Sequence, residues 1–485
     1  MGPLSRLNHF FWRYKYLFIP GLLFTMISAA FQITVPMVVR QAVDSIPRFV
    51  RLFNLYEGTP AQTELYSFFF VSLLLFAGGI IGLSATSGLF MFLMRQTMVV
   101  ASRHIEYDLR NDLYDHLQQL AAPFYNEYST GDVITRATDD IEKVRRYIGP
   151  AIMYVTRSLV MVLVAMSVMF VISPTLTLYA LAPMPLLAIS VFFMAQMVHH
   201  RSEKLQEQYS TLTSRVQEAL SGIRVLKAYT REEAEAEAFE KESEQYKWRN
   251  LNLALVESAW RPSFLLLVGI STIIVVWMGG RLVAQGSITI GNIAEYIIYI
   301  NMMTWPVASL GFVITMIQRA SASVIRLQKI MDTEPAIDDG PQTNPSLQSI
   351  EGHIQFDDVW YQYEGEDEPA LRGVSFDLPA DQTLAIVGRT GSGKSTLVRM
   401  IPRLLDPDKG RVLIDDNDLK TIPLDTVRQH MGYVPQDVFL FSDTVANNIA
   451  FGDLGAERDA IRAAADEADL LENVEDFPDG FDTYV

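Results

Sequence analysis

Long apolar runs constrain this 485-residue chain more than any other feature of its sequence. A stretch of about 20 apolar residues is long enough to cross a bilayer as a helix. The alternative, buried helices of a soluble core, is disfavoured because several runs exceed about 18 residues with almost no charge. We therefore expect six transmembrane helices, at residues 16–39, 66–94, 148–172, 176–198, 253–283 and 288–317.

Composition agrees with a membrane protein and narrows its partners. Hydrophobic residues make up 49% of the chain, and cysteine is absent, which excludes a disulfide framework or cysteine-ligated metal within these residues. The net charge of −17 is uneven: residues 1–332 carry 28 Lys+Arg and 25 Asp+Glu, whereas residues 333–485 carry 11 and 31. Phosphate contacts need a basic surface, so we expect no nucleic-acid partner for the acidic second part.

The distribution of lysine and arginine predicts the orientation of the spans. Positive residues gather between spans two and three and between spans four and five, at Arg95, Arg103, Arg110, Arg136, Lys143, Arg145, Arg146, Arg201, Lys204 and Arg215. These connections should face the cytoplasm, together with both termini. The opposite connections are poorer in positive charge, with Arg40, Arg48, Arg51 and Arg281 as exceptions.

Both cytoplasmic connections have helical rather than loop-like patterns. About 20 extra helical residues would carry each helix about 30 Å beyond the bilayer, far enough to reach a cytoplasmic domain. The helices should turn at residues 129–132 and 220–222, where Ser and Gly can cap a short crosswise helix.

A change of composition divides the chain into two domains. Residues 1–330 form the predicted transmembrane domain, and residues 331–350, with Pro335, Pro341 and Pro345, form a linker. Residues 351–485 form a second domain. Strands are expected there at residues 354–363, 374–378, 411–414 and 432–434.

The second domain contains a complete phosphate-binding motif. Residues 384–387 are expected to form a buried strand, residues 388–393 a loop, and Lys394 the start of a helix, which is the context that G-x-x-x-x-G-K-[ST] requires. Backbone amides and the helix N-terminus would attract phosphates, Lys394 would reach the terminal phosphates, and Ser395 would hold Mg²⁺. The alternative is an ordinary glycine-rich turn. The predicted nucleotide contacts are Gly388, Arg389, Thr390, Gly391, Ser392, Gly393, Lys394, Ser395 and Thr396.

The order of parts resembles the ATP-binding cassette exporters. The resemblance rests on the P-loop together with Tyr363, the segment 370–376 and the segment 432–437. It implies a six-helix α-helical transmembrane domain with long cytoplasmic extensions, followed by an α/β P-loop NTPase domain. It also implies that ATP is the nucleotide, that Tyr363 stacks on adenine, and that Gln436 contacts Mg²⁺ and the attacking water. Lys394 and Gln436 would then be the catalytic residues.

The same resemblance implies a function and a location. Segments 129–132 and 221–225 would be the two coupling helices. The chain would export an amphipathic or hydrophobic molecule, a drug or a lipid, by ATP-driven alternating access in a homodimer or heterodimer of half-transporters. It would cross the cytoplasmic (inner) membrane several times with the nucleotide-binding domain in the cytoplasm. An alternative is a hydrolysis-deficient regulatory partner in a heterodimer, and an importer is disfavoured because importers usually place the two parts on separate chains.

The sequence departs from the family pattern in two places. The chain stops at Val485, before the expected signature, catalytic carboxylate and switch histidine, so we expect the α/β domain to be incomplete at its C-terminus. Asp415-Asp416 stands where the family often has Asp-Gly, a change that a turn tolerates.

Ionisable residues within the predicted spans are candidate substrate contacts. They are Arg157, which could instead snorkel to the interface, Glu257 and Arg261, which could pair on one helix face, and Glu295 as a site for a cation. On the sixth span, apolar and aromatic residues could line an adaptable cavity or simply pack against neighbouring helices. These residues are Tyr296, Tyr299, Met302, Met303 and Trp305.

Overall fold

The computed structural model describes residues 2–436 and 438–485, except for the side chains at positions 187, 188, 191, 260, 261, 307, 308 and 310. The chain divides into two compact units. The first contains residues up to Tyr114 together with Ile134–Ile330, and the second contains Asp115–Val133 and Met331–Val485. Asp437, the last residue of the predicted glutamine motif, lies outside the described residues.

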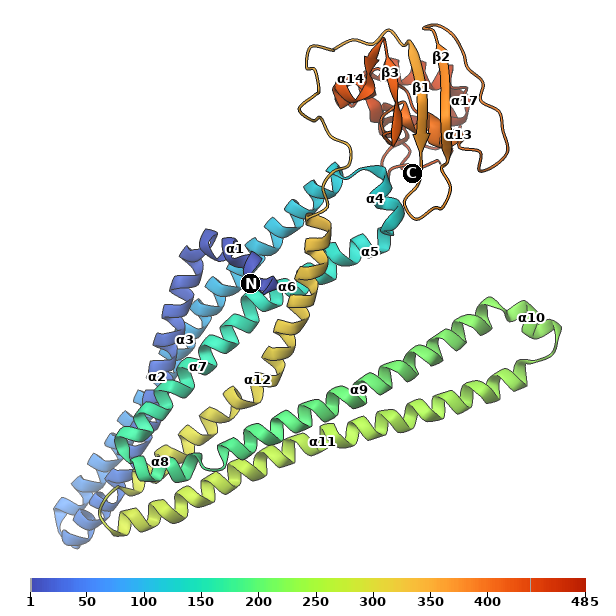
Figure 1. Cartoon of the computed structure of the whole chain (residues 1–485). Coiled ribbons are helices and arrows are strands. Elements are labelled where there is room, and N and C mark those ends of the chain that lie inside the picture. The colour runs from blue at the N-terminus through green and yellow to red at the C-terminus, as the bar shows by residue number, and fades with distance from the viewer. Residues whose placement is uncertain (1, 437) are drawn as a thin grey trace. The chain divides into compact units, whose positions relative to one another are not determined.

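The first unit is built of long helices (Figure 1). A short helix, α1 (Asn8–Arg13), precedes the others, which are α2 (Lys15–Leu55), α3 (Pro60–Gln119), α6 (Ile141–Arg146), α7 (Ile152–Ile172), α8 (Pro174–Leu181), α9 (Met184–Ser221), α10 (Ile223–Ala228), α11 (Glu232–Ala284) and α12 (Ile290–Met331). Among the described residues, five helices are long and apolar enough to cross a membrane. They are Lys15–Leu55, Pro60–Gln119, Thr130–Ile172, Glu232–Ala284 and Ile290–Met331.

The predicted fourth span is divided between two helices. Ser173 ends α7 and caps α8, because its side chain accepts a hydrogen bond from the amide of Leu176 (3.2 Å). A second break separates α8 from α9 at Ala182 and Pro183, where proline removes a backbone donor. The predicted turn after Ile172 is therefore present, whereas the count of six spans stays a prediction.

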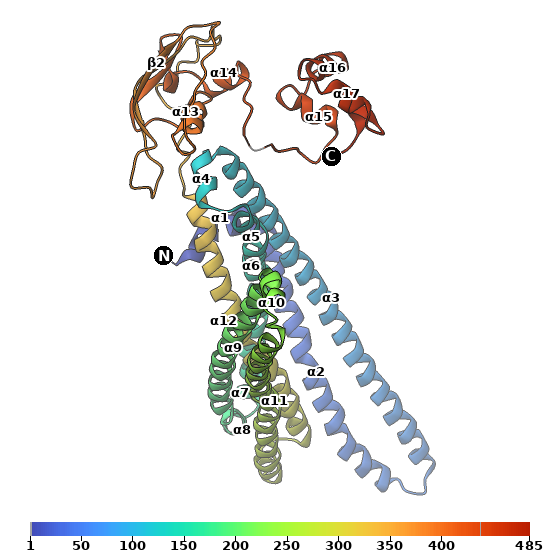
Figure 2. The ribbon, with the colours of Figure 1, turned by 90° about the vertical axis from the view of Figure 1, so that its right-hand side faces the viewer.

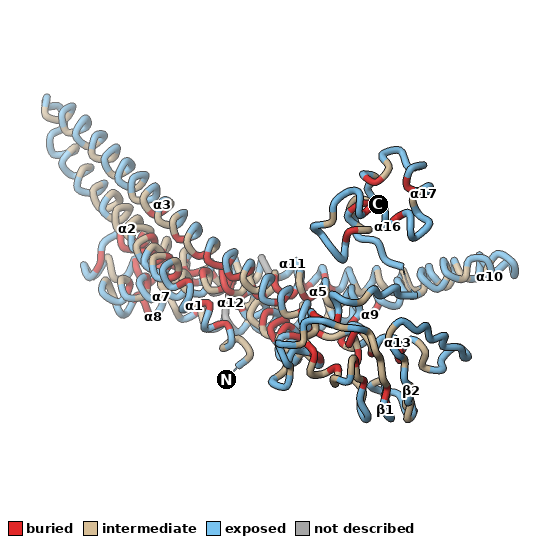
Figure 3. The backbone as a smooth tube through the Cα atoms, turned by 90° about the horizontal axis from the view of Figure 1, so that it is seen from above, coloured by how far each residue is buried: buried red, intermediate tan, exposed pale blue. Residues whose placement is uncertain are grey.

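The core of the first unit lies where the helices α2, α7, α8, α11 and α12 meet. Its fully buried members include Met169, Leu176, Val275, Tyr296 and Tyr299. Helices α9 and α11 run side by side as a long hairpin that α10 closes, and most of the hairpin surface is exposed (Figure 3). The predicted turn at residues 220–222 is present, because α9 ends at Ser221 and the six-residue helix α10 follows Gly222.

The first predicted interruption is also present, in the second unit. The short helix α4 (Ala122–Glu127) ends before Ser129, and α5 (Thr130–Thr135) begins directly after it. The side-chain oxygen of Ser129 accepts a hydrogen bond from the amide of Asp132 (3.2 Å), which is the expected N-cap.

The second unit contains a four-stranded antiparallel sheet in the order β2-β1-β3-β4. The strands are β1 (Ile354–Tyr361), β2 (Leu371–Leu378), β3 (Lys409–Ile414) and β4 (Asn417–Asp418). In the register, Phe356 pairs with Phe376 on β2 and with Val412 on β3. The buried side chains of the sheet pack against α13 (Lys394–Met400) and α14 (Leu424–Gln429).

A second hydrophobic cluster in this unit belongs to a group of short helices. These helices are α15 (Val445–Ile449), α16 (Arg458–Glu467) and α17 (Leu471–Glu475), and Figure 2 shows them gathered together. Ile461 and Ala465 of α16 bury one face against Val445 and Phe481. The two clusters share no buried residue.

Two predicted strands are wrong for this structure. Residues 384–387 and 432–434 have no strand assignment, and Val387 and Val434 are each 93% exposed. A buried parallel strand needs paired neighbours, and no described strand pairs with either segment. The three other predicted strands are present, at β1, β2 and β3.

The Asp415-Asp416 turn is accommodated without glycine. Both residues adopt positive φ angles, +49° and +61°. The Asp415 carboxylate also accepts hydrogen bonds from the amides of Glu351 (2.7 Å), Gly352 (3.0 Å) and His353 (2.9 Å), which fixes the turn against the start of β1. Aspartate tolerates this left-handed conformation better than most residues.

Candidate functional site

The P-loop motif forms a tight loop whose backbone favours glycine at two positions. Gly391 and Gly393 have φ angles of +81° and +87°. A side chain at Gly393 would place its Cβ 2.5 Å from the carbonyl oxygen of Ala370, so the loop approaches the chain before β2 very closely. A Cβ at Gly388 would lie 2.7 Å from the Ser392 hydroxyl. The loop is therefore compact backbone that leads directly into α13.

The ammonium group of Lys394 lies over this loop. Its Nζ donates hydrogen bonds to the carbonyl oxygens of Gly388 (2.9 Å) and Arg389 (2.8 Å). These carbonyls hold the cation at the mouth of the loop, where it can exchange them for phosphate oxygens. The loop residues Thr390 and Ser392 are exposed.

Tyr363 is joined to the helix that follows the P-loop. Its hydroxyl lies 3.0 Å from the hydroxyl of Thr396, the third residue of α13, and Thr396 is buried. The Tyr363 ring also meets the ring of Tyr361 edge-on, with 5.0 Å between centroids. Burial raises the pKa of Tyr361 to about 12, so this supporting ring stays uncharged at neutral pH. The aromatic residue is thus placed beside the P-loop. Sequence reasoning did not anticipate the role of Thr396 in holding it.

Three of the predicted phosphate and metal contacts line one cavity. Lys394, Ser395 and Gln436 face a space of about 490 Å³, which Leu384, Ile386, Val398, Arg399 and residues 433–435 complete. An ammonium group suits phosphate, and a hydroxyl with an amide oxygen suits a hard divalent cation. The residues present therefore fit a magnesium–nucleotide complex.

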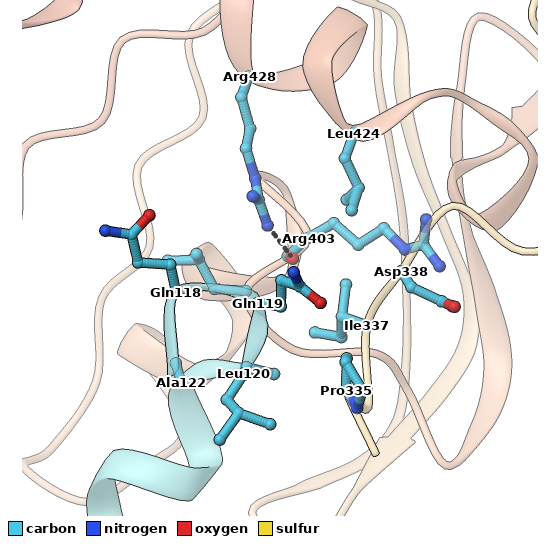
Figure 4. A pocket seen from close by; sticks show the side chains of 12 residues that line it. Gln118, Gln119, Leu120, Ala122, Pro335, Ile337, Asp338, Arg403, Leu424 and Arg428 are labelled. Atoms are coloured by element: carbon cyan, nitrogen blue, oxygen red, sulfur yellow. Dashed lines mark hydrogen bonds between the residues drawn. The ribbon is translucent and has the colours of Figure 1, made fainter. Parts of the chain in front are cut away.

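A second cavity of about 440 Å³ lies where the end of α3 meets the linker and the sheet domain within the second unit. Residues 118–122 form one wall, and the linker contributes Pro335, Ile337 and Asp338. Arg403 and Arg428 line the opposite side, and Nη2 of Arg428 donates to the carbonyl oxygen of Arg403 (3.2 Å; Figure 4). Ala122, the first residue of α4, also lines the cavity, so the segment before the first predicted coupling helix and the sheet domain share its walls.

The ionisable residues of the spans have different environments. Nη2 of Arg157 donates to the amide oxygen of Gln32 (3.3 Å), and its Nη1 lies 2.9 Å from the sulfur of Met91. Arg157 is only partly buried. Glu257 is exposed, and the side chain of Arg261 lies outside the described residues, so the predicted pair between them stays a prediction.

Glu295 is fully buried and its carboxylate contacts other side chains of the protein. Its partners are Arg40 (3.4 Å), Asn292 (3.2 Å) and Tyr299 (3.2 Å). A cationic substrate would have to displace Arg40 to reach this carboxylate. In this conformation the structure therefore contradicts the hypothesis that Glu295 is an open cation site.

The aromatic and apolar residues of the sixth span mostly pack inside the helix bundle. Tyr296 and Tyr299 are fully buried, Met303 is 4% exposed, and the hydroxyl of Tyr296 donates to the carbonyl oxygen of Met169 (2.5 Å). Only Trp305 is largely exposed in this set, with Met302 partly buried. Packing thus explains Tyr296, Tyr299 and Met303 better than cavity lining does.

Comparison with known proteins gives two family matches. The family model described as "ABC transporter transmembrane region" matches residues 17–307, and the model described as "ABC transporter" matches residues 371–480. The second match includes the P-loop and Gln436.

Curated relatives cover most of the chain. The chain is 33% identical to the multidrug resistance-like ATP-binding protein MdlA of Escherichia coli over 81% of its own length and 66% of the relative's. It is 32% identical to the ATP-dependent lipid A-core flippase of Chromohalobacter salexigens over 84% of its own length and 70% of the relative's. It is 30% identical over its entire length, and 80% of the relative's, to the uncharacterized ABC transporter ATP-binding protein YknU of Bacillus subtilis. The chain thus spans about two thirds to four fifths of the length of these relatives.

Proposed function

The chain belongs to the ABC transporter family, and from that premise we propose that it is one half of an ATP-driven exporter. One observation supports the proposal most strongly: Lys394, Ser395 and Gln436 share a cavity at the P-loop of a chain that also carries long apolar helices. The proposed cargo is an amphipathic or hydrophobic molecule, a drug or a lipid. Names of relatives such as the multidrug resistance-like protein and the lipid A-core flippase are consistent with this class.

The proposed roles of the site residues follow from their chemistry. Bound MgATP supplies the phosphoryl group whose transfer to water drives the cycle. The amides of the Gly388–Thr396 loop and the Lys394 ammonium bind the phosphates, and the Ser395 hydroxyl and Gln436 amide oxygen bind the cation. Tyr363 offers its ring face to the adenine. The two catalytic residues are therefore Lys394 and Gln436.

The proposed setting is the cytoplasmic (inner) membrane, with the P-loop domain on the cytoplasmic side. The 485 residues carry one P-loop, and we propose that a second half-transporter, identical or related, supplies the other. Closure of two such domains on two nucleotides would alternate access to a cavity between the membrane helices. We expect no nucleic-acid partner, because the second domain is strongly acidic.

Replacing Lys394 tests the proposal at its centre. In the purified full-length protein in lipid, Lys394→Ala should lower Mg²⁺-dependent ATP hydrolysis at least about 100-fold. The negative charge on the transferred phosphoryl group would lose the Lys394 ammonium that stabilises it, an effect of about 100-fold or more. The matched control is Lys409→Ala, which removes an exposed lysine of β3 whose described contact is the ring of Trp360. Full activity in Lys394→Ala would contradict the proposal.

The alternative, a hydrolysis-deficient regulatory partner, has no observation in its favour. A regulatory partner would bind ATP normally but would not hydrolyse it in the wild-type homodimer. Measuring both ATP binding and ATP hydrolysis in the same purified protein therefore distinguishes the two functions.

A further inference from the structure

A polar cluster joins α2 to the start of α12 at the end of the spans remote from the linker. Glu295 at its centre has no exposed surface. The predicted orientation of the spans places it on the extracytoplasmic side. We call it the α2–α12 latch, and its residues are Arg40 and Asp44 on α2 with Thr289, Asn292, Glu295 and Tyr299 at the start of α12.

The inner half of the latch surrounds the Glu295 carboxylate. Nη1 of Arg40 reaches Oε2 at 3.4 Å, and Nδ2 of Asn292 donates to the same oxygen at 3.2 Å. The hydroxyl of Tyr299 lies within reach of Oε1 (3.2 Å) and of the α2 carbonyl oxygen of Ile33 (3.1 Å). Two of these contacts, from Arg40 and to Ile33, cross directly between the helices.

The outer half of the latch caps α12 with a side chain from α2. The Asp44 carboxylate accepts hydrogen bonds from the hydroxyl of Thr289 (2.7 Å) and from the amide of Gly291 (2.8 Å). Free amides at a helix N-terminus favour a negative charge, so Asp44 adds a carboxylate to the local cap that Thr289 provides. Thr289 and Asn292 complete the turn through hydrogen bonds to each other.

Gly291 lets the two helices approach this closely. A Cβ there would lie 2.7 Å from Cγ of Asp44 and would clash with the Arg40 carbonyl oxygen. The backbones are therefore in direct contact, and the polar groups match only when α2 and the start of α12 touch.

The position of the latch determines where it can open. Separating a buried charge pair into hydrocarbon would leave Glu295 unpaired at high cost. Separating it into water is far cheaper, and the two α2 members, Arg40 and Asp44, are already partly exposed. The latch can therefore open only toward an aqueous space.

We propose that the α2–α12 latch is a gate that is closed in this conformation and opens to water when the membrane cavity faces the side remote from the linker. The inference rests on the proposed export function, since it assigns the latch to one half of the transport cycle. It also gives Glu295 a role in gating.

The absence of cysteine makes the gate directly measurable. A double variant with one cysteine at Leu52 on α2 and one at Ile290 on α12 can carry two spin labels. Both positions are exposed and lie outside the latch. In full-length protein reconstituted in lipid, double electron–electron resonance should give one short label distance without nucleotide. Addition of MgATP should produce a second, longer distance.

Latch variants should shift this equilibrium without nucleotide. Glu295→Gln should raise the ratio of open to closed protein about tenfold, because a charge-assisted contact is lost. Asp44→Asn serves as the second variant if Glu295→Gln does not fold. The matched control Glu64→Gln removes an exposed acid on α3 and should leave the ratio unchanged. Combining Arg40→Gln with Glu295→Gln should add little to either change alone.

The outcomes separate this inference from the proposed function. An unchanged label distance in vesicles that show ATP-driven transport would overturn the gate and leave the export function intact. The gate would also be overturned if Glu295→Gln or Asp44→Asn left the ratio of open to closed protein equal to that of the wild type. Absence of ATP-driven transport in the wild type would instead contradict the export function.

Discussion

At the residue scale, the P-loop glycines show how much the backbone alone determines. Gly391 and Gly393 both have positive φ angles, but their surroundings differ. Gly393 lies against the Ala370 carbonyl oxygen, whereas a Cβ at Gly391 would meet nothing within 4 Å. The sequence motif marks the glycine at 393 but cannot show which neighbour requires it.

This difference predicts unequal effects of alanine. Gly391→Ala should cost about 1–2 kcal/mol from the left-handed backbone alone. Gly393→Ala should cost more, since the methyl group also meets Ala370, and it should weaken ATP binding at least about tenfold. Thermal unfolding and nucleotide titration of the two variants check this. Equal losses at both positions would contradict the close approach at Gly393.

Single residues in the spans show the limit of sequence reasoning. Glu295 is recognisable as a buried charge in an apolar run, but its partner Arg40 lies 255 positions away. A pairing over such a distance has no local pattern. Asp44 carries even less signal, because one carboxylate near the end of a span can equally be a solvated residue.

At the scale of elements, a buried carboxylate fixes α12 to the helical segment before α7. Asp140 is 1% exposed, and it accepts hydrogen bonds from Nη2 of Arg326 (2.6 Å) and from the hydroxyl of Ser323 (2.9 Å). Lys143 adds a third contact at 3.2 Å. This clamp holds the part of α12 that continues toward the linker.

Removing the charge of Asp140 should loosen the helix bundle. Asp140→Asn should destabilise the protein by about 1–3 kcal/mol, because it weakens charge-assisted hydrogen bonds to a buried carboxylate. The exposure of Arg326 screens its charge and limits the loss. The neighbouring exposed Asp139→Asn is the matched control. The thermal midpoint of the detergent-solubilised chain should fall only for Asp140→Asn, and a similar fall in both variants would argue against the clamp.

Helices and strands differ in how well the sequence predicts them. The long helices, the Ser173 break and the turn at Gly222 follow from local apolar pattern and capping, which the chain carries in each segment. The strands predicted at residues 384–387 and 432–434 depend on neighbours to pair with, and none of the described strands pairs with them. Antiparallel strands β1, β2 and β3 formed because they supply partners for each other.

At the scale of the whole molecule, two kinds of sequence meet in one chain. Residues 1–332 contain long apolar runs and have a nearly balanced charge, whereas residues 333–485 are strongly acidic and contain the P-loop. Composition, the order of these parts and the motif together predicted the family that the comparisons show. They carry no information about the cargo, because apolar packing and a cavity lining use the same residue types.

ATP-driven movement of an amphipathic molecule across a bilayer tests the central claim most directly. The full-length protein would be reconstituted in vesicles with a fluorescent amphipathic dye or a fluorescently labelled phospholipid, and probe movement would be followed after MgATP is added outside. We predict movement that needs ATP and Mg²⁺ and is lost in Lys394→Ala. Movement that is the same without ATP, or unchanged in Lys394→Ala, would contradict the account.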